Sequence, residues 1–166
     1  MSCIHRWISW SSLEYLATVD YTLTGQFIDL RNGIIYVSLI GVQATLAERN
    51  YFIALDKKNG YRKKLLKLLQ DLAKDLNITD KVSILEGGSV GIGIHPVEYD
   101  KVQVACYIEE NMTNFGQISY FGDKWTPEGN DYKLLNHAIL TGYKVSSVDE
   151  TIQILRGSNG KIDIIG

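Results

Sequence analysis

Cysteine and an excess of charge of either sign are both lacking in this chain. Its 166 residues include two cysteines, Cys3 and Cys106, and 17 basic residues stand against 19 acidic ones, for a formal net charge of -2. Two isolated cysteines form neither a metal-binding pair nor a disulfide framework, so we expect a reducing compartment. Cys106 lies in a helical pattern, which predicts a small core residue. The balanced charge offers no general field for nucleic acid or an anionic membrane, so we expect neither as a partner.

Long apolar runs are absent as well. No stretch approaches the length needed to span a bilayer, and Ser9, Ser11 and Glu14 interrupt the opening segment, so it is not a signal peptide. We therefore expect a soluble cytoplasmic protein. One local basic run is followed by Asp71 and Asp75 and has no aromatic stacking platform, which favours a solvated helix face over a phosphate or nucleic-acid patch. This run comprises Lys57, Lys58, Arg62, Lys63, Lys64 and Lys67.

Helix signals occur in two parts of the first 96 residues. Near the start, apolar residues at a three-residue spacing predict one side of a short amphipathic helix packed in a core, namely Trp7, Trp10, Leu13 and Leu16. Further on, Thr45 and Glu48 match a capping box, in which hydroxyl and carboxylate satisfy free N–H groups reciprocally, so a helix should begin here and run to about residue 55. A second helix follows Gly60, with a buried stripe at Leu65, Leu68, Leu69, Leu72 and Leu76.

Two hairpin signals surround these helices. Asn32-Gly33 stands between β-rich runs at 26–31 and 34–40, and this pair is the strongest short hairpin signal because the turn needs positive φ angles. Gly87-Gly88 separates a second pair of apolar runs. Hairpins separated by helices predict an antiparallel sheet with helices on one face, and Pro96 ends this α+β unit.

Beyond Pro96 the pattern changes to alternating helices and strands. Helices are predicted at 98–112, 130–139 and 148–155, and strands at 117–121 and 142–145. Strands that alternate with helices imply a parallel sheet. Two strands are too few for a stable doubly wound domain, so part of the sheet is expected to be missing.

The segment from residue 120 to residue 132 concentrates acidic, amide, glycine and proline residues immediately after an apolar run. Asp123 follows the carboxyl end of the predicted strand, where open α/β sheets place their ligands, so the segment resembles a metal-binding turn. An ordinary strand-to-helix connection fits equally well, with Asp123 exposed and Asn130 or Asp131 as the N-cap. The spacing alone leaves both interpretations open.

Several stretches together resemble the eukaryotic-type phosphomannomutases of the haloacid dehalogenase superfamily. These stretches span residues 25–33, 46–49, 55–58, 87–88, 100–101, 120–124 and 127–131, in the family's order. The resemblance implies an α+β cap domain (antiparallel sheet with helices) at 1–96. It implies the C-terminal part of an incomplete, Rossmann-like α/β core of the haloacid dehalogenase type at 97–166.

The resemblance also implies a chemistry. The family converts mannose 6-phosphate to mannose 1-phosphate for GDP-mannose biosynthesis, with Mg²⁺ and a covalent aspartyl phosphate that divides the transfer into two steps. By this resemblance, Lys101 is the phosphoryl-site lysine, Asp123 is the metal acid with Asn130 and Asp131 in support, and Arg31 binds the distal phosphate of a hexose phosphate.

The chain departs from the family pattern at the nucleophile and in the cap. It contains no Asp-x-Asp-Gly-Thr motif and begins, by resemblance, inside the cap, so the isolated chain should be inactive. Thr24 and Val42 replace two phosphate-binding arginines, which leaves one guanidinium and no clamp. Gly91 and Gly93 replace the Ser and Asp that accept sugar hydroxyls.

The cation site departs too, because the second cation loop carries His137 in place of an Asp, so Mg²⁺ binding should be weak or lost. Three explanations stay open: a gene fragment, half of a split enzyme, and a pseudoenzyme that serves as a dimerising or sugar-phosphate-binding module. We expect either a homodimer through the cap or association with a missing N-terminal half.

Overall fold

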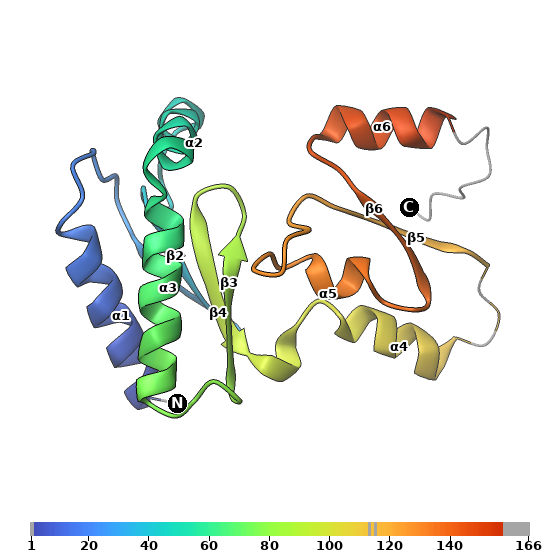
Figure 1. Cartoon of the computed structure of the whole chain (residues 1–166), viewed down its shortest axis with the longest axis horizontal. Helices are drawn as coiled ribbons and strands as arrows, with labels where there is room; N and C mark the ends of the chain where they lie inside the picture. Colours follow the sequence, from blue (N-terminus) through green and yellow to red (C-terminus); the bar gives the residue numbers. More distant parts are fainter. Residues whose placement is uncertain (1, 113, 115, 158–166) are drawn as a thin grey trace. The chain divides into compact units, whose positions relative to one another are not determined.

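The structure, a computed structural model, describes residues 2–112, 114 and 116–157. The chain divides into two compact units, Met1–Asp100 (unit 1) and Lys101–Gly166 (unit 2) (Figure 1). The sequence placed a boundary after residue 96. None of the described helices has the length and apolar character needed to cross a membrane.

Unit 1 contains a four-stranded antiparallel sheet. Its strands are β1 (Ile28–Arg31), β2 (Ile34–Ser38), β3 (Val82–Gly87) and β4 (Gly91–Pro96), in the order β1-β2-β4-β3. Both predicted hairpins are confirmed, with Arg31 paired to Ile34 in the first and Gly87 paired to Gly91 in the second. In the first turn Gly33 has a positive φ of 75°, whereas Asn32 does not, so the turn needs one left-handed residue rather than two.

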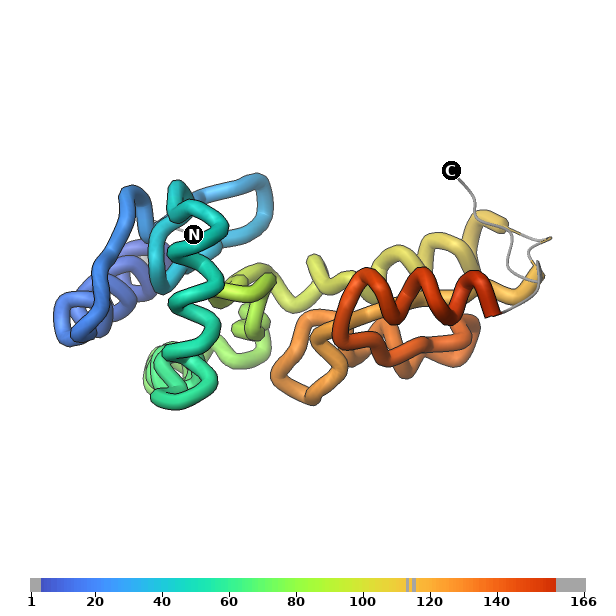
Figure 2. The backbone as a smooth tube through the Cα atoms, turned by 90° about the horizontal axis from the view of Figure 1, so that it is seen from above, coloured from blue at the N-terminus to red at the C-terminus, as the bar shows by residue number. Residues whose placement is uncertain are grey.

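Three helices accompany this sheet: α1 (Ser2–Leu16), α2 (Leu46–Asn59) and α3 (Tyr61–Asp75) (Figures 1 and 2). The capping box is confirmed, since the Glu48 amide donates to the Thr45 hydroxyl and the Thr45 amide donates to the Glu48 carboxylate. Helix α2 runs four residues past the predicted end, and Gly60, at φ 67°, turns the chain directly into α3.

Strand alternation separates two faces of the sheet in unit 1. Ile35 and Val37 on β2 and Ile92 and Ile94 on β4 are buried in one cluster with side chains of the three helices, including Phe52. The opposite face, which we call the open face, carries Tyr36 of β2 and the glycines of β4. Side chains that alternate with the buried ones must point to this open face.

The core role predicted for both tryptophans of α1 is wrong. Trp7 and Trp10 are 47% and 67% exposed, and the buried side of α1 is formed by Ile8, Ser12 and Leu16. Residues spaced by three drift about 60° per step around a helix, whereas residues spaced by four stay closer to one line. The spacing of four therefore marks the buried stripe.

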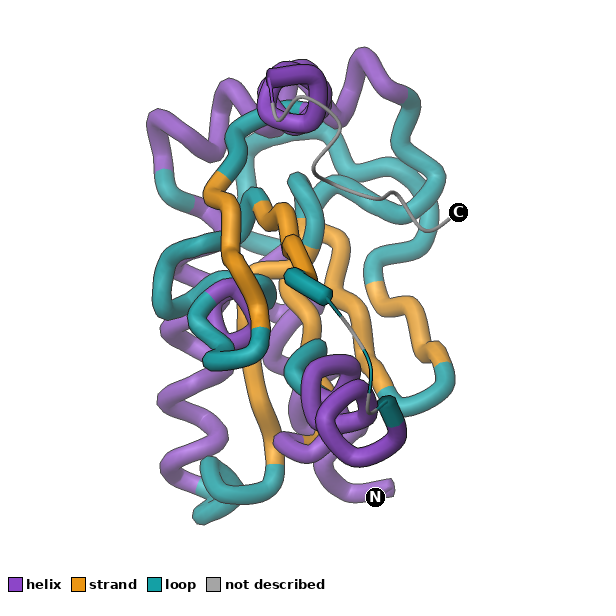
Figure 3. The backbone as a smooth tube through the Cα atoms, turned by 90° about the vertical axis from the view of Figure 1, so that its right-hand side faces the viewer, coloured by secondary structure: helices purple, strands orange, loops and turns teal. Residues whose placement is uncertain are grey.

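Unit 2 alternates helices and strands as predicted. Its elements are α4 (Gln103–Asn111), β5 (Ile118–Gly122), α5 (Tyr132–Leu135), β6 (Leu140–Lys144) and α6 (Val148–Gly157) (Figure 3). Strands β5 and β6 pair in parallel, which confirms the predicted arrangement.

Two helices of unit 2 are shorter than predicted. A 3₁₀ turn, η1 (Val97–Tyr99), and an extended Asp100 occupy the expected start of α4. Helix α5 covers one turn, and the chain then turns through His137 toward β6. The core role predicted for Cys106 is wrong, because this side chain is exposed and Ala105 is the buried residue of α4.

Candidate functional site

Asp131 is the centre of a polar cluster in unit 2. Its side chain is 4% exposed and accepts hydrogen bonds from Lys101 Nζ at 2.5 Å, Tyr120 Oη at 2.7 Å and the Lys124 amide at 3.0 Å. Asp131 occupies the N-cap position of α5 but makes no side-chain cap bond there. The structure thus brings Lys101 and Asp131 together, two of the four site residues that the sequence predicted in this unit.

The loop after β5 explains how Asp131 reaches this position. The Gly129 amide donates to the Thr126 carbonyl and the Asp131 amide to the Lys124 carbonyl, which folds the loop back toward the strand. A Cβ at Gly122 would lie 2.8 Å from Asp131 Cβ, so only glycine leaves room for the carboxylate here. The sequence stretch of acidic and glycine residues therefore encodes a buried carboxylate beside the end of β5.

The electrostatics of the cluster follow from burial and from three donors. Burial alone acts to raise the pKa of Asp131, but the hydrogen bonds from Lys101, Tyr120 and Lys124 outweigh it, so this pKa lies below its ordinary value. Burial and the bond to Asp131 raise the pKa of Tyr120, which therefore keeps its proton and donates. The cluster pairs a charged carboxylate with a half-exposed ammonium group on Lys101.

Asp123 lies at the end of β5 and is not part of this cluster. Its side chain is 60% exposed and pairs with Lys124 Nζ at 2.9 Å. Among the described residues no group of three His, Cys, Asp or Glu side chains could hold a metal ion. Since Mg²⁺ sites in proteins combine carboxylates with substrate phosphate, the described residues do not form a complete Mg²⁺ site by themselves. Asn130 is half-buried, directly before Asp131, and its supporting role stays a prediction.

Arg31 stands at the end of β1 in unit 1. Its Nε donates to Asp29 Oδ2 at 2.7 Å, and its guanidinium carbon lies 4.9 Å from the centre of the Tyr36 ring. The Thr24 hydroxyl donates to Glu48 and the Val42 carbonyl accepts a bond, and the replacement of arginines at these two positions stays a prediction. Arg31 therefore contacts both Asp29 and Tyr36 on the open face while its side chain stays half-exposed.

The donor to Val42 is Arg49, a second arginine that sequence reasoning did not single out. Its Nη2 donates to the Val42 carbonyl at 2.6 Å and its Nε to the Ala44 carbonyl at 2.9 Å. The signal was present, because Arg49 closes the matched stretch 46–49. The backbone carbonyls hold this guanidinium at the start of α2.

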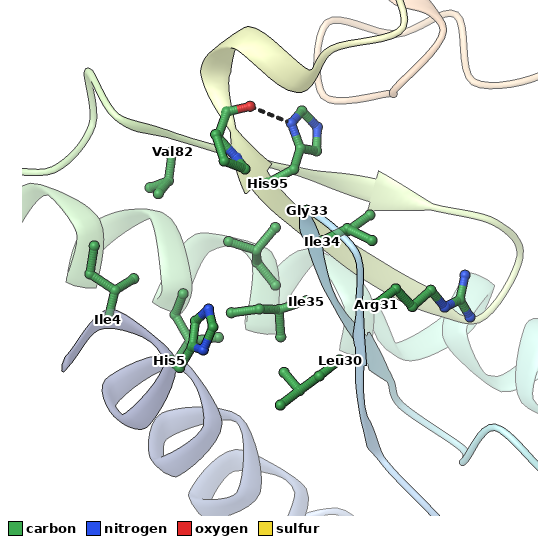
Figure 4. A pocket seen from close by; sticks show the side chains of 12 residues that line it. Ile4, His5, Leu30, Arg31, Gly33, Ile34, Ile35, Val82 and His95 are labelled. Carbon is green, nitrogen blue, oxygen red and sulfur yellow. Dashed lines mark hydrogen bonds between the residues drawn. The ribbon is translucent and has the colours of Figure 1, made fainter. Parts of the chain in front are cut away.

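Unit 1 also contains a cavity of about 110 Å³ between α1 and the ends of β1, β2 and β4 (Figure 4). Its lining is mainly aliphatic, with Ile4, Ile8, Leu30 and Ile35 among the residues, and His5 and His95 are the ionisable members apart from Arg31. In Figure 4 the Arg31 side chain extends away from the other lining groups, and His95 Nδ1 bonds to the Pro96 carbonyl at 2.8 Å. This cavity offers apolar contact rather than acid–base chemistry.

Comparison with known proteins identifies the family of this chain. Residues 3–158 match the family model described as eukaryotic phosphomannomutase. The chain belongs to the eukaryotic phosphomannomutase family. It is 34% identical over 144 residues to the phosphomannomutase of Saccharomyces cerevisiae, covering 86% of this chain and 54% of that protein. For Arabidopsis thaliana the identity is 33%, with 85% and 54% covered. The chain thus spans about half the length of the phosphomannomutases it matches.

Solved structures agree at the level of fold. The N-terminally truncated IMP-nucleotidase of Plasmodium falciparum superimposes with a TM-score of 0.62, covering 93% of this chain and 38% of that protein. The sequence identity is 12%, so this likeness concerns the fold alone. An antiparallel sheet with helices and a parallel two-stranded sheet are consistent with the haloacid dehalogenase type that the family resemblance predicts.

Proposed function

We propose that this chain carries the cap (unit 1) and the C-terminal part of the core (unit 2) of a phosphomannomutase and has no mutase activity by itself. The observation that carries the proposal is the combination of an ordered Lys101–Asp131–Tyr120 cluster with a sequence that contains no Asp-x-Asp-Gly-Thr motif. The cluster can stabilise a phosphoryl group, but a transfer through an aspartyl phosphate needs a nucleophile. The reaction served would be the conversion of mannose 6-phosphate to mannose 1-phosphate for GDP-mannose biosynthesis in the cytoplasm.

Each residue has a role that its contacts support. Lys101 is anchored by Asp131 and remains 44% exposed, so its ammonium group can contact a phosphoryl oxygen while the buried carboxylate keeps it in place. The exposed carboxylate of Asp123 would exchange its pair with Lys124 for a cation, with Asn130 in support, and the remaining ligands must come from elsewhere. Magnesium would supply charge neutralisation at the phosphoryl group once that ligand set is complete.

An activity assay tests the proposal. The purified chain, incubated with mannose 1-phosphate, Mg²⁺ and a hexose bisphosphate activator, should yield no mannose 6-phosphate, and turnover would overturn the proposal. Adding the separately expressed N-terminal segment of the yeast relative, provided that it contains the motif, tests for a split enzyme. Activity gained in that mixture should disappear with Lys101→Met and persist with Lys63→Met, which replaces an exposed lysine of unit 1.

A non-catalytic dimerising or sugar-phosphate-binding module is the second candidate. A non-catalytic role is favoured because Arg49 is engaged with backbone carbonyls, which leaves the exposed Nη groups of Arg31 as a single weak phosphate contact in place of a clamp. Exposed Trp10 and Leu30 provide apolar surface on unit 1 for a second copy. Light scattering after size exclusion should then show a dimer that Trp10→Ser weakens and Leu46→Ser, at an exposed site of α2, leaves intact. A monomer at all concentrations would refute the dimer.

A further inference from the structure

On the open face of unit 1, strand β4 carries glycines beside a tyrosine of the neighbouring strand β2. On β4 this face carries Gly91 and Gly93, and Tyr36 of β2 is paired directly with Gly93. A Cβ at Gly91 would lie 2.4 Å from Tyr36 Cζ and 2.5 Å from the Val37 carbonyl oxygen. The ring of Tyr36 therefore occupies the space that a side chain at position 91 would need.

The Tyr36 ring is fixed at its hydroxyl end. Tyr36 Oη donates to the Gly87 carbonyl at 3.2 Å, and a Cβ at Gly87 would lie 3.3 Å from Tyr36 Cε2. The ring thus spans from β2 across β4 to the end of β3. Burial raises the pKa of the Tyr36 phenol, although Arg31 opposes this, so the ring is neutral at physiological pH.

Arg31 lies over this ring. Its guanidinium carbon is 4.9 Å from the ring centre and its Nε donates to Asp29, so two contacts at different points set the plane of the guanidinium group. The side chain remains 53% exposed. With Nε committed, the Nη groups form the part of the guanidinium that an anion can approach, while the Asp29 carboxylate lowers the net positive charge and keeps such binding weak.

We propose that Tyr36 determines what the open face of unit 1 binds, because its ring fills the space at position 91 of β4 and holds the Arg31 guanidinium in position for a phosphate group. The face then recognises the phosphate of a monoester without contacting the sugar attached to it. Tyr36 is a positioning and specificity-determining residue here, and this inference rests on the sugar-phosphate-binding module proposed above as the second candidate function. The Ser that the family resemblance implies at position 91 would conflict with this ring, whereas a side chain at position 93 would first meet Ile34 Cδ1, 3.3 Å from a Cβ there.

Comparing the affinities of two ligands tests whether the open face recognises the sugar. The full chain is titrated with inorganic phosphate and with mannose 6-phosphate, and binding is followed by NMR, including the Nε–H signal of Arg31. The two dissociation constants should agree within about threefold, since neither position 91 nor position 93 carries a side chain that could bond a sugar hydroxyl. A tenfold preference for mannose 6-phosphate would overturn the inference.

Variants separate positioning from folding. Tyr36→Phe keeps the ring and loses only the bond to Gly87, so phosphate affinity and the ring-shifted Arg31 signal should persist. Tyr36→Leu removes the ring, and phosphate affinity should fall about fivefold, the size of an exposed cation–π contact, with loss of that shift. Tyr36→Met serves the same purpose if the leucine variant does not fold. Unchanged affinity and an unchanged Arg31 signal in a folded non-aromatic variant would refute the role of Tyr36.

Arg31→Gln distinguishes failure of the inference from failure of the phosphate site. This variant should abolish phosphate binding. If the wild-type chain binds no phosphate, or if Arg31→Gln binds it as the wild type does, the phosphate site at Arg31 fails and the inference falls with it. If Arg31→Gln abolishes binding but Tyr36→Leu and Tyr36→Met bind normally, the site stands and the inference alone is wrong.

Discussion

The two units of this chain bury their apolar residues to different extents. Among the described residues of unit 1, seventeen buried side chains form one cluster under a four-stranded sheet. In unit 2 the described residues include four buried hydrophobic side chains, Ala105, Leu134, Leu135 and Val145, beside a two-stranded parallel sheet. Unit 1 therefore has a core that can support its own fold, whereas unit 2 depends to a greater degree on the polar cluster around Asp131.

The exposed residues of unit 2 support the same contrast. Parallel sheets are normally covered on both faces, and two strands seldom suffice for an independent fold. Val104 and Tyr107 of α4 and Val148 of α6 are nevertheless 59%, 63% and 75% exposed. These side chains are available to pack against further polypeptide, in keeping with a chain that spans about half the length of its relatives.

The largest expected effect is on the core of unit 1. Phe52 is fully buried, and its ring centre lies 5.2 Å from that of Tyr21 in an edge-to-face contact. Phe52→Ala should lower the free energy of unfolding by about 3–5 kcal/mol, through lost burial and the cavity left behind. Urea denaturation measures the free energy of unfolding, and hydrogen exchange in β2 and β4 shows whether the loss is in unit 1. Leu46→Ala, at an exposed site of the same helix, should change stability by about 0.5 kcal/mol or less. Equal losses for both would contradict a tightly packed unit 1.

Removing the charge of Asp131 should have a smaller effect, confined to unit 2. Asp131→Asn leaves the Lys101 ammonium without its carboxylate and should cost about 1–3 kcal/mol of local stability. Faster hydrogen exchange at the Lys124 amide and in β5 would report it. Asp123→Asn is the matched control, because its exposed pair with Lys124 is worth about 0–1 kcal/mol. The contrast between the units breaks down if unit 1 amides respond to Asp131→Asn as strongly as those of β5.

Acidification should weaken the same cluster. Because the folded-state pKa of Asp131 lies below its ordinary value of 3.8, its contribution to stability is fully present above about pH 4 and is lost as the pH falls through the folded pKa. The carboxyl carbon of Asp131 should titrate below pH 3.8 in NMR spectra. Loss of structure around Trp125 should follow its protonation, and Asp131→Asn should remove this pH dependence. Titration above 3.8 would mean that burial outweighs the three donors.

Local signals in the sequence predicted much of the fold. Both hairpins, the capping box at Thr45 and the parallel pairing of β5 with β6 depend on short-range patterns or on chain order, and all are present. The sequence did not predict correctly which side of a helix is buried. Trp7 and Cys106 are exposed because burial depends on which face of a helix packs against its unit, and neither the spacing of three in α1 nor the helical pattern around Cys106 fixes that face.

The candidate sites were harder to predict because their contacts join distant residues. Lys101 and Asp131 were named from the family resemblance, but their 2.5 Å bond and the participation of Tyr120 depend on a loop that folds back onto β5. In unit 1, the sequence predicted that the glycine at position 91 replaces a sugar-binding side chain of the family. Its steric conflict with Tyr36 becomes visible only when β2 and β4 lie side by side.

The smallest expected effects come from removing the helix caps of the two units. Thr45 caps α2 and Ser147 accepts from the Glu150 amide at 3.2 Å at the start of α6. Thr45→Ala should lower the global stability of unit 1 by about 1 kcal/mol, because α2 contributes Phe52 to the core and cannot fray alone. Ser147→Ala should instead increase hydrogen exchange within α6 only, since that helix has no buried residue among those described. A global loss from Ser147→Ala, equal to that from Thr45→Ala, would show that α6 is as tightly coupled to its unit as α2 is to unit 1.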